Sequence, residues 1–206
     1  IRRVFAMRAP AVPAGYHLLA ISLAEQGTEG PWGSLPDLLR TDAFDLFRQK
    51  GLEPYRPVVG GHFGKTIPGI FTDEAKPFGV CPSTPELYAG FAAAYGYDLR
   101  PRLYQLFGEP LSDEYVKTRL DYRRWIAARF LETFVRPYRR WCDANGLLLV
   151  GHFSPEDDPI QEAWCLGAAS PIMRAARVPG GDVIVPNVGG HRAPALSPGR
   201  LGTESG

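Results

Sequence analysis

The sequence predicts an α/β fold in which parallel strands are joined by crossover helices. The continuous apolar run at residues 146–153 is typical of a strand that a parallel sheet buries on both faces. Residues 65–72 are a short, mostly apolar strand candidate, although Pro68 within it cannot donate to a ladder. A long helical pattern lies between these runs, and a further helix and a strand at 181–186 follow. This order of strand, helices, strand, helix and strand is typical of parallel strands with helical crossovers.

The chain is too short for a complete barrel of this class. It has 206 residues, whereas a complete (β/α)8 TIM barrel takes about 250. We therefore expect a partial TIM barrel over residues 31–185. Residues 1–30 contain two apolar runs and predict a hairpin or edge strands, and residues 186–206 lack apolar periodicity and predict a disordered tail.

The shorter helices are predicted from caps and breakers. A helix begins near Thr41 or Asp42, with Phe44, Phe47 and Tyr55 near helical spacing, and the prolines at 54 and 57 kink or end it. Another begins at the Thr84–Pro85 pair and ends at Gly96, and a short helix follows over residues 97–108.

The longest helix is expected from Ser112 to Gly146. Asp113 and Glu114 suit its first turn, because negative charge there complements the helix dipole. Pro137 is expected to bend its last turns. An apolar stripe recurs every four residues; its members are Tyr122, Ile126, Phe130, Phe134 and Tyr138, and Trp141 and Cys142 continue it.

Composition and motifs argue against several functional classes. The net charge is +1 and 22% of the residues are charged, without the basic stripe typical of nucleic-acid binders. No apolar run reaches the length of a membrane span. The three cysteines form no CxxC, and HExxH, GxSxG, GxxxxGK[ST] and GxGxxG are absent. We therefore expect no cofactor, no metal, no nucleic acid and no membrane.

Polar side chains follow two of the predicted strands. Asp73 and Glu74 end the first, and His152 ends the second, with Glu156 a few residues further on. Functional groups of α/β folds gather at the carboxyl ends of parallel strands. If these two strands are neighbours, about 4.8 Å apart, Glu74, His152 and Glu156 converge on one site.

Structural roles are open for the same residues. Asp73 or Glu74 can cap a following turn, and His152 can be a hydrogen-bonded core histidine. The acidic residues Asp157 and Asp158 suit the start of the next helix. The second Gly-His-Phe, at residues 61–63, precedes its strand, so its histidine is not a site candidate.

Two carboxylates at neighbouring strand ends suit glycoside hydrolysis. One carboxyl group protonates the leaving oxygen, and the other attacks the sugar or activates a water. Aromatic residues in loops, such as Trp32 and Phe78, can stack on sugar faces, although packing is the commoner role of such residues.

Four stretches, in this order, carry a resemblance to a known family. They are FGKTIPGIFTDE, AAYGYDLRPRL, RLDYRRWIAARFLETFVRPYRRWCDANGLLLVGHFSPED and RVPGGDV. They resemble large bacterial glycoside hydrolases that are often labelled family 2-like or α-L-rhamnosidase-like. The resemblance spans roughly residues 35–185. It implies the catalytic TIM barrel of a longer chain, whose remaining barrel strands and β-sandwich domains are the partners of this segment.

The resemblance implies roles for individual residues. The family's acidic pair after a barrel strand falls on Asp73 and Glu74, which makes Glu74 the proton donor and Asp73 a substrate-binding group. Its Gly-His and glutamate fall on 151–152 and on Glu156, the second catalytic acid, with His152 binding an oligosaccharide or glycoside. Trp32 lies outside the resemblance and is a substrate-binding candidate only as a loop aromatic. The family has proline after the acidic pair, where this chain has Ala75.

Two alternatives to an enzyme stay open at this point. The segment can be a non-catalytic carbohydrate-binding fragment, because half a barrel with one carboxylate pair can bind sugar without cleaving it. It can also be a truncated structural fragment of such an enzyme. The sugar, the linkage, the stereochemical course and the compartment are not predicted.

Overall fold

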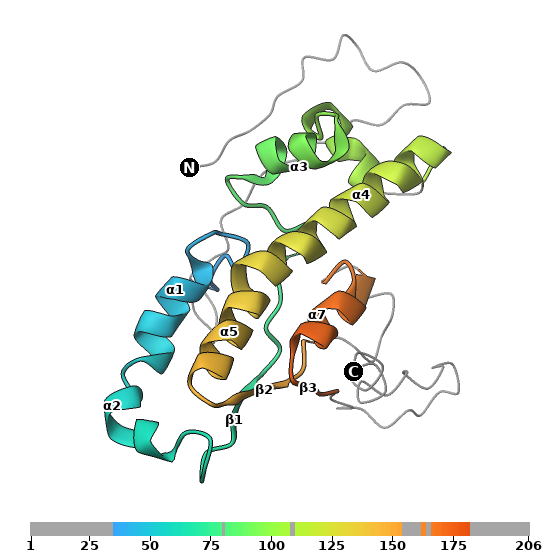
Figure 1. Ribbon diagram of the computed structural model, residues 1–206. Helices are drawn as coiled ribbons and strands as arrows, with labels where there is room; N and C mark the ends of the chain where they lie inside the picture. The colour runs from blue at the N-terminus through green and yellow to red at the C-terminus, as the bar shows by residue number, and fades with distance from the viewer. Residues whose placement is uncertain (1–34, 80, 108–109, 154–161, 164–165, 182–206) are drawn as a thin grey trace, which may run out of the picture.

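The computed structural model describes residues 35–79, 81–107, 110–153, 162–163 and 166–181 (Figure 1). The predictions for residues 1–30 and 186–206 lie outside the described residues. The described elements are, in chain order, α1 (Ala43–Phe47), η1 (Arg48–Leu52), α2 (Arg56–Val59), η2 (Gly60–His62), β1 (Gly69–Thr72), α3 (Leu87–Tyr95), η3 (Arg100–Leu106), α4 (Asp113–Phe130), η4 (Leu131–Val135), α5 (Arg136–Ala144), β2 (Leu148–Gly151), α7 (Ala169–Ala175) and β3 (Val178–Pro179).

The sheet has three strands in the order β1-β2-β3, and both pairings are parallel. Gly69 pairs with Leu148 and Thr72 with Gly151, so the two apolar runs are neighbours in register. The predicted α/β class and the parallel pairing of these two strands are confirmed. The third strand lies at Val178–Pro179, before the predicted 181–186, of which residues 182–186 lie outside the described residues.

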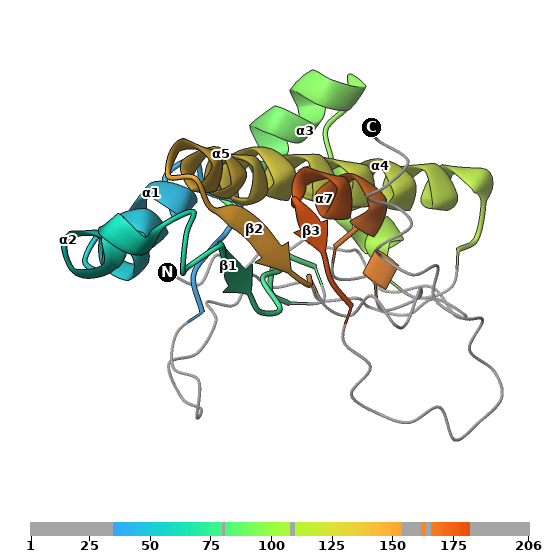
Figure 2. The same ribbon diagram turned by 60° about the horizontal axis from the view of Figure 1, so that its bottom comes forward.

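One long helix crosses the sheet. The segments α4, η4 and α5 follow one another without a break from Asp113 to Ala144, as the sequence predicts (Figure 2). All seven residues of the predicted apolar stripe are buried. Phe130 packs edge-on against Phe153, just after β2, with ring centroids 6.3 Å apart. The stripe therefore faces the sheet and forms the centre of the core.

Pro137 does not break this helix. It occupies the first turn of α5, immediately after the π-helical turn η4. A π-helical turn uses i→i+5 hydrogen bonds in place of i→i+4, which changes the carbonyl that each N–H must reach. Since the missing N–H of a proline is tolerated in a first turn, the change of hydrogen-bonding pattern accommodates Pro137.

The predicted helix before β1 ends ahead of the prolines, as expected. Asp42 is the N-cap residue of α1, as predicted, and Pro57 lies in the first turn of α2. Phe44 is buried against Tyr138, with ring centroids 5.6 Å apart. Tyr55 is exposed, so its predicted place on an apolar face is wrong, because the chain leaves the helix after η1 at Leu52.

The predicted helices after β1 are present with shifted bounds. The helix α3 begins at Leu87, two residues after Pro85, and ends at Gly96, which adopts the left-handed conformation with φ +77°. The expected short helix follows as the 3₁₀ segment η3. A 3₁₀ geometry suits a short connector between α3 and α4.

The described helices α1, α4, α5 and α7 cover one face of the sheet, and we call the opposite face the open face. In Figure 2, α1, α5, α4 and α7 lie on one side of the strands. Phe71, Val150 and Val178 form a cross-strand row, and Leu148 lies two residues before Val150. Phe71 is 61% exposed, and Leu148 and Val178 are exposed as well. The row therefore belongs to the open face of the sheet, which consists of Phe71, Leu148, Val150 and Val178.

We expect the 206-residue chain to self-associate through this open face, because contiguous exposed apolar side chains favour association. Phe71→Thr is expected to reduce the oligomeric fraction in light scattering at a given protein concentration. Leu111→Thr is the matched control, since Leu111 is exposed but precedes α4, away from the sheet. A monomer at all concentrations, or an equal effect of both substitutions, contradicts this expectation.

The contact between the ends of β1 and β2 depends on Gly151. Its φ is +137°, and a Cβ there would lie 2.7 Å from the Thr72 nitrogen and 2.9 Å from the Thr72 carbonyl carbon. Gly151→Ala is expected to lower the free energy of unfolding by about 2–3 kcal/mol, because it adds both a clash and strain. Gly61→Ala is the control, because a Cβ at Gly61 meets nothing within 4 Å. Urea unfolding measures both, and equal stabilities contradict the model of this contact.

Candidate functional site

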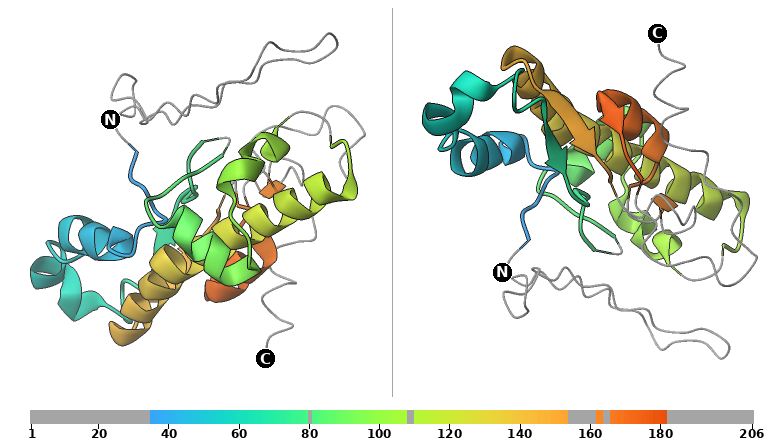
Figure 3. Two further views of the ribbon diagram at one scale, coloured as in Figure 1. Left: turned by 90° about the horizontal axis from the view of Figure 1, so that it is seen from above. Right: turned by 90° about the horizontal axis from the view of Figure 1, so that it is seen from below.

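The candidate site lies where β1 and β2 end. Thr72 pairs with Gly151, and the backbone N–H of His152 donates to the Thr72 carbonyl oxygen at 3.2 Å. The N–H of Gly180, just after β3, donates to the Gly151 carbonyl at 2.7 Å. All three strands therefore end at one edge of the sheet, as the parallel pairing requires (Figure 3).

Asp73 and His152 form a side-chain pair at this edge. Asp73 Oδ1 lies 2.7 Å from His152 Nε2. Because side chains alternate along a strand, both residues project from the face that carries Phe71 and Val150. The ring of Phe71 lies beside the imidazole, with centroids 6.0 Å apart.

The two partners differ in exposure. The His152 side chain is 3% exposed, whereas that of Asp73 is 78% exposed. The buried imidazole thus has little surface for a ligand, and it holds the exposed carboxylate in place. His152 is therefore a buried, hydrogen-bonded histidine, which was the structural role left open for it above.

Glu74 is held in an unusual backbone conformation. Its φ is +48°, and it is the only non-glycine residue with positive φ in the described part of the chain. Such a conformation costs an L-residue about 1–2 kcal/mol. Asp73 before it is bonded to His152, and Lys76 after it reaches Glu74 Oε2 at 3.4 Å. The Glu74 side chain is 42% exposed and therefore accessible at the end of β1.

The structure brings three of the five predicted site residues together. Asp73, Glu74 and His152 lie at the shared edge of β1 and β2. Glu156 and Trp32 lie outside the described residues, so the predicted pairing of Glu74 with Glu156 stays a prediction. Phe78, the other aromatic candidate, is partly buried and packs against the core.

Sequence reasoning missed the role of Lys76. Lys76 follows the candidate acid by two positions and forms an ion pair with it. A basic residue two positions after a candidate acid was the signal for this contact. The pair is partly exposed, so it contributes about 0–1 kcal/mol and can open readily.

His62 lies away from this edge. It ends η2 before β1, is exposed, and its Nδ1 lies 3.4 Å from Thr66 Oγ1. The expectation that only the second Gly-His-Phe belongs to the candidate site agrees with this placement.

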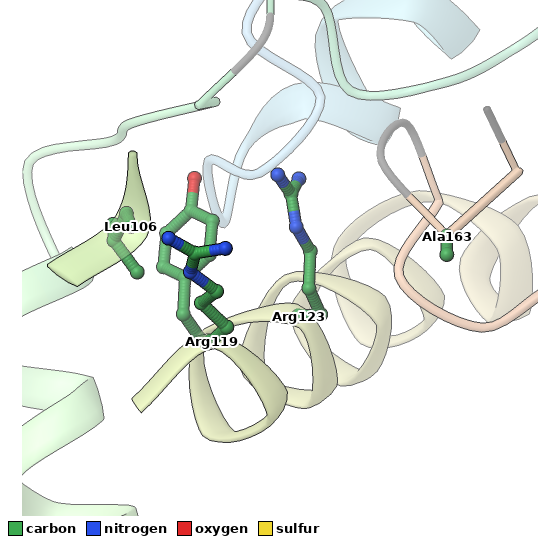
Figure 4. A pocket seen from close by; sticks show the side chains of 5 residues that line it. Leu106, Arg119, Arg123 and Ala163 are labelled. Atoms are coloured by element: carbon green, nitrogen blue, oxygen red, sulfur yellow. The ribbon is translucent and has the colours of Figure 1, made fainter. Parts of the chain in front are cut away.

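A small pocket lies along α4, apart from the residues above (Figure 4). Its volume is about 160 Å³, and it is lined by Leu106, Arg119, Tyr122, Arg123 and Ala163. Arg119 donates to the carbonyl oxygens of Gln105 and Phe107. Burial raises the pKa of the Tyr122 phenol, which donates to the Pro82 carbonyl at 2.6 Å. These bonds tie α4 to the segments around it, which gives this pocket wall a structural role.

Within the ranges that the structure describes, no group of three or more His, Cys, Asp or Glu residues is arranged to hold a metal ion. Within the same ranges, none of the helices combines the length and the apolar character needed to cross a membrane.

Comparisons with known proteins return no match. Neither a family model, nor a curated protein sequence, nor a solved structure matches this chain. The functional argument therefore depends on the geometry at the ends of β1 and β2, together with the resemblance described above.

The strained conformation of Glu74 can be tested without knowledge of the reaction. Glu74→Gly is expected to raise the free energy of unfolding by about 0.5–1 kcal/mol relative to Glu74→Ala, because only glycine adopts positive φ without strain. Both variants remove the same carboxylate, so the difference between their free energies of unfolding in urea reports the backbone strain at this position. A Gly variant that is no more stable than the Ala variant contradicts the positive φ.

Proposed function

We propose that this chain is a segment of a glycoside hydrolase that cleaves O-glycosidic bonds by carboxyl acid/base chemistry. The observation that carries the proposal is the exposed pair Asp73–Glu74 at the carboxyl end of a parallel strand, with a buried histidine fixing Asp73. Enzymes of the α/β barrel class place their catalytic groups at this end of the strands. The resemblance to family 2-like and α-L-rhamnosidase-like hydrolases points to the same residues.

The proposed roles follow from the positions of the groups. Glu74 donates a proton to the leaving oxygen, and Glu156 is the second acid, which attacks the sugar or activates a water. Asp73, held by His152, accepts a hydrogen bond from a sugar hydroxyl, and Trp32 stacks on a sugar face. Because Lys76 is bonded to Glu74, substrate must displace its ammonium group before the glutamate acts as an acid.

In this proposal the three-stranded sheet is part of a TIM barrel. The missing strands and the β-sandwich domains belong to a longer chain, and the open face of the sheet is the side that points into the barrel. The apolar residues of that face, of which Phe71 is the most exposed, suit the packed interior of a barrel.

A carbohydrate-binding segment without turnover is the second candidate. The exposed Asp73 carboxylate and the ion-paired Glu74 favour it, because both can accept hydrogen bonds from sugar hydroxyls without any proton transfer. Turnover of aryl glycosides, measured beside equilibrium binding of the same sugars, separates the two candidates.

We expect Glu74→Gln to lower the rate of aryl-glycoside hydrolysis by about 10²–10⁴-fold, because loss of a general acid has effects of this size. The measurement needs the longest natural chain that contains this segment. Glu132→Gln is the matched control, since Glu132 is an exposed carboxylate on η4 that pairs with Arg136. Undiminished activity of the Glu74 variant rules out this residue as the proton donor.

The distance between the two carboxyl groups decides the stereochemical course. A separation of about 5–5.5 Å favours retention, and one of about 6.5–9.5 Å favours inversion. We expect the wider spacing between Glu74 and Glu156, because Glu156 lies three positions beyond Phe153 and this offset leaves room for a water. Proton NMR of the first-formed anomer measures the outcome, and retention contradicts the wider spacing.

A further inference from the structure

Lys76 is a cation held beside the proposed proton donor. Its Nζ lies 3.4 Å from Glu74 Oε2, and its side chain is only 21% exposed. Lysine side chains are mostly exposed in folded proteins, because an ammonium group loses its hydration on burial. A lysine that is covered to this extent at the end of a strand therefore needs an anion beside it.

The backbone around Lys76 is anchored on both sides. Ala75 and Phe78 are partly buried and pack against the core, and Pro77 is buried. A proline fixes its own φ and restricts the residue before it, so the backbone conformation at Lys76 is narrowed as well. The ammonium group therefore extends from a fixed segment, which lowers the entropy that is lost when a ligand binds to it.

The proposed reaction changes the charge of Glu74, and this change leaves Lys76 without its counter-ion. A general acid must carry a proton before it can give one to the leaving oxygen. A protonated Glu74 has no charge, so the ion pair is lost while the ammonium group stays largely covered. An unpaired charge in such a place is unfavourable, and an anion on the substrate would replace the lost partner. A neutral sugar offers only hydroxyl groups to the ammonium.

We infer that the ligand of this site is a sugar that carries an anionic group, and that Lys76 binds this group. The inference rests on the proposed function for the role of Glu74, whereas binding of an anion by Lys76 does not require turnover. The carboxylate of a uronic acid and a sulfate ester share the required chemistry, since both accept charge-assisted hydrogen bonds from an ammonium group. Because Lys76 contacts Glu74, the anionic group belongs to one of the two sugar rings that the scissile bond joins.

The second carboxylate at this edge opposes an anionic ligand less than Lys76 favours it. The Asp73 side chain is 78% exposed, so water and salt screen its charge. Lys76 is far less exposed, so the field of its ammonium group is screened less. His152 holds Asp73 at 2.7 Å, where the exposed carboxylate can accept from a sugar hydroxyl. Together the two groups select a ligand that has both a hydroxyl and an anion.

Paired probes that differ only in charge test the inference. The para-nitrophenyl glycosides of glucose, galactose and mannose are compared with those of the corresponding uronic acids and sulfate esters, in equilibrium binding to the longest natural chain that contains this segment. We expect at least one charged probe to bind about tenfold or more tightly than its neutral counterpart. This preference should shrink as the salt concentration is raised. Tighter binding of the uronic acid or of the sulfate ester identifies the source of the anion.

Three substitutions assign the preference to Lys76. Lys76→Gln is expected to abolish it, whereas Lys76→Arg should retain most of it because the positive charge persists. Lys65→Gln is the matched control, since Lys65 is an exposed lysine that precedes β1, at the opposite end of the strand. Glu74→Gln is expected to tighten binding of the charged probe by up to about fivefold, because the competing carboxylate of a partly exposed ion pair is removed. Binding of the neutral probe should not tighten in this variant.

Three results overturn the inference: neutral probes that bind as tightly as the charged ones, no binding of any charged probe, or a preference that Lys76→Gln leaves intact. If urea unfolding shows that this variant does not fold, the wild-type comparison and its salt dependence decide the question. Failure of the proposed function is a separate outcome, because it appears as binding of the charged probe without hydrolysis. Hydrolysis of a neutral glycoside without any preference for the charged one supports the proposed function and overturns the inference.

Discussion

The close approach of Gly151 to Thr72 is the constraint on which the candidate site depends. No side chain fits between the two backbones at this point, so β2 can follow β1 to its end only with glycine here. The next residue then bonds to β1 twice, through the backbone of His152 to Thr72 and through its imidazole to Asp73. Without this approach the exposed carboxylate and the turn at Glu74 would lose the histidine that holds them.

Long-range hydrogen bonds fix the helix layer that supports these strand ends. Thr133 Oγ1 donates to the Leu38 carbonyl at 2.7 Å, and Trp141 Nε1 donates to Glu53 Oε1 at 3.0 Å. Both bonds join residues before β1 to the long helix. Each contributes about 1 kcal/mol, and loss of one partner from a buried pair costs more, because the other partner is left without its bond. The segment before β1 is therefore held by specific polar contacts as well as by aromatic packing.

The elements that the sequence predicts well are those with strong local patterns. The apolar stripe from Tyr122 to Tyr138 keeps the same four-residue spacing along about five helical turns. Gly96 follows α3 and adopts the left-handed conformation that ends a helix. The strand at Val178–Pro179 was not predicted, because it is short and contains proline, whereas the neighbouring run at 181–186 has a stronger strand pattern. Long-range bonds, from Arg177 to Leu149 and from Gly180 to Gly151, place β3 beside β2.

The candidate site was predictable in position but not in detail. Parallel strands with acidic and histidine ends predict a shared edge, and Asp73, Glu74 and His152 do meet there. The positive φ of Glu74 has no local signal in the residues, whereas the position of Lys76 two residues later was a signal for their contact. The burial of His152 depends on the residues that pack over it, and the spacing of residues along the sequence does not predict these contacts.

The π-helical turn η4 has a consequence for how the chain tolerates insertions and deletions. A turn of this kind holds one residue more than an α-helical turn, so deletion of one residue within Leu131–Val135 leaves a regular α-helix with both flanking faces in place. The same deletion within α4 rotates the preceding face by about 100° and removes it from the sheet. Homologous chains that differ in length by one residue within this helix can therefore keep the same core only if the difference falls in η4.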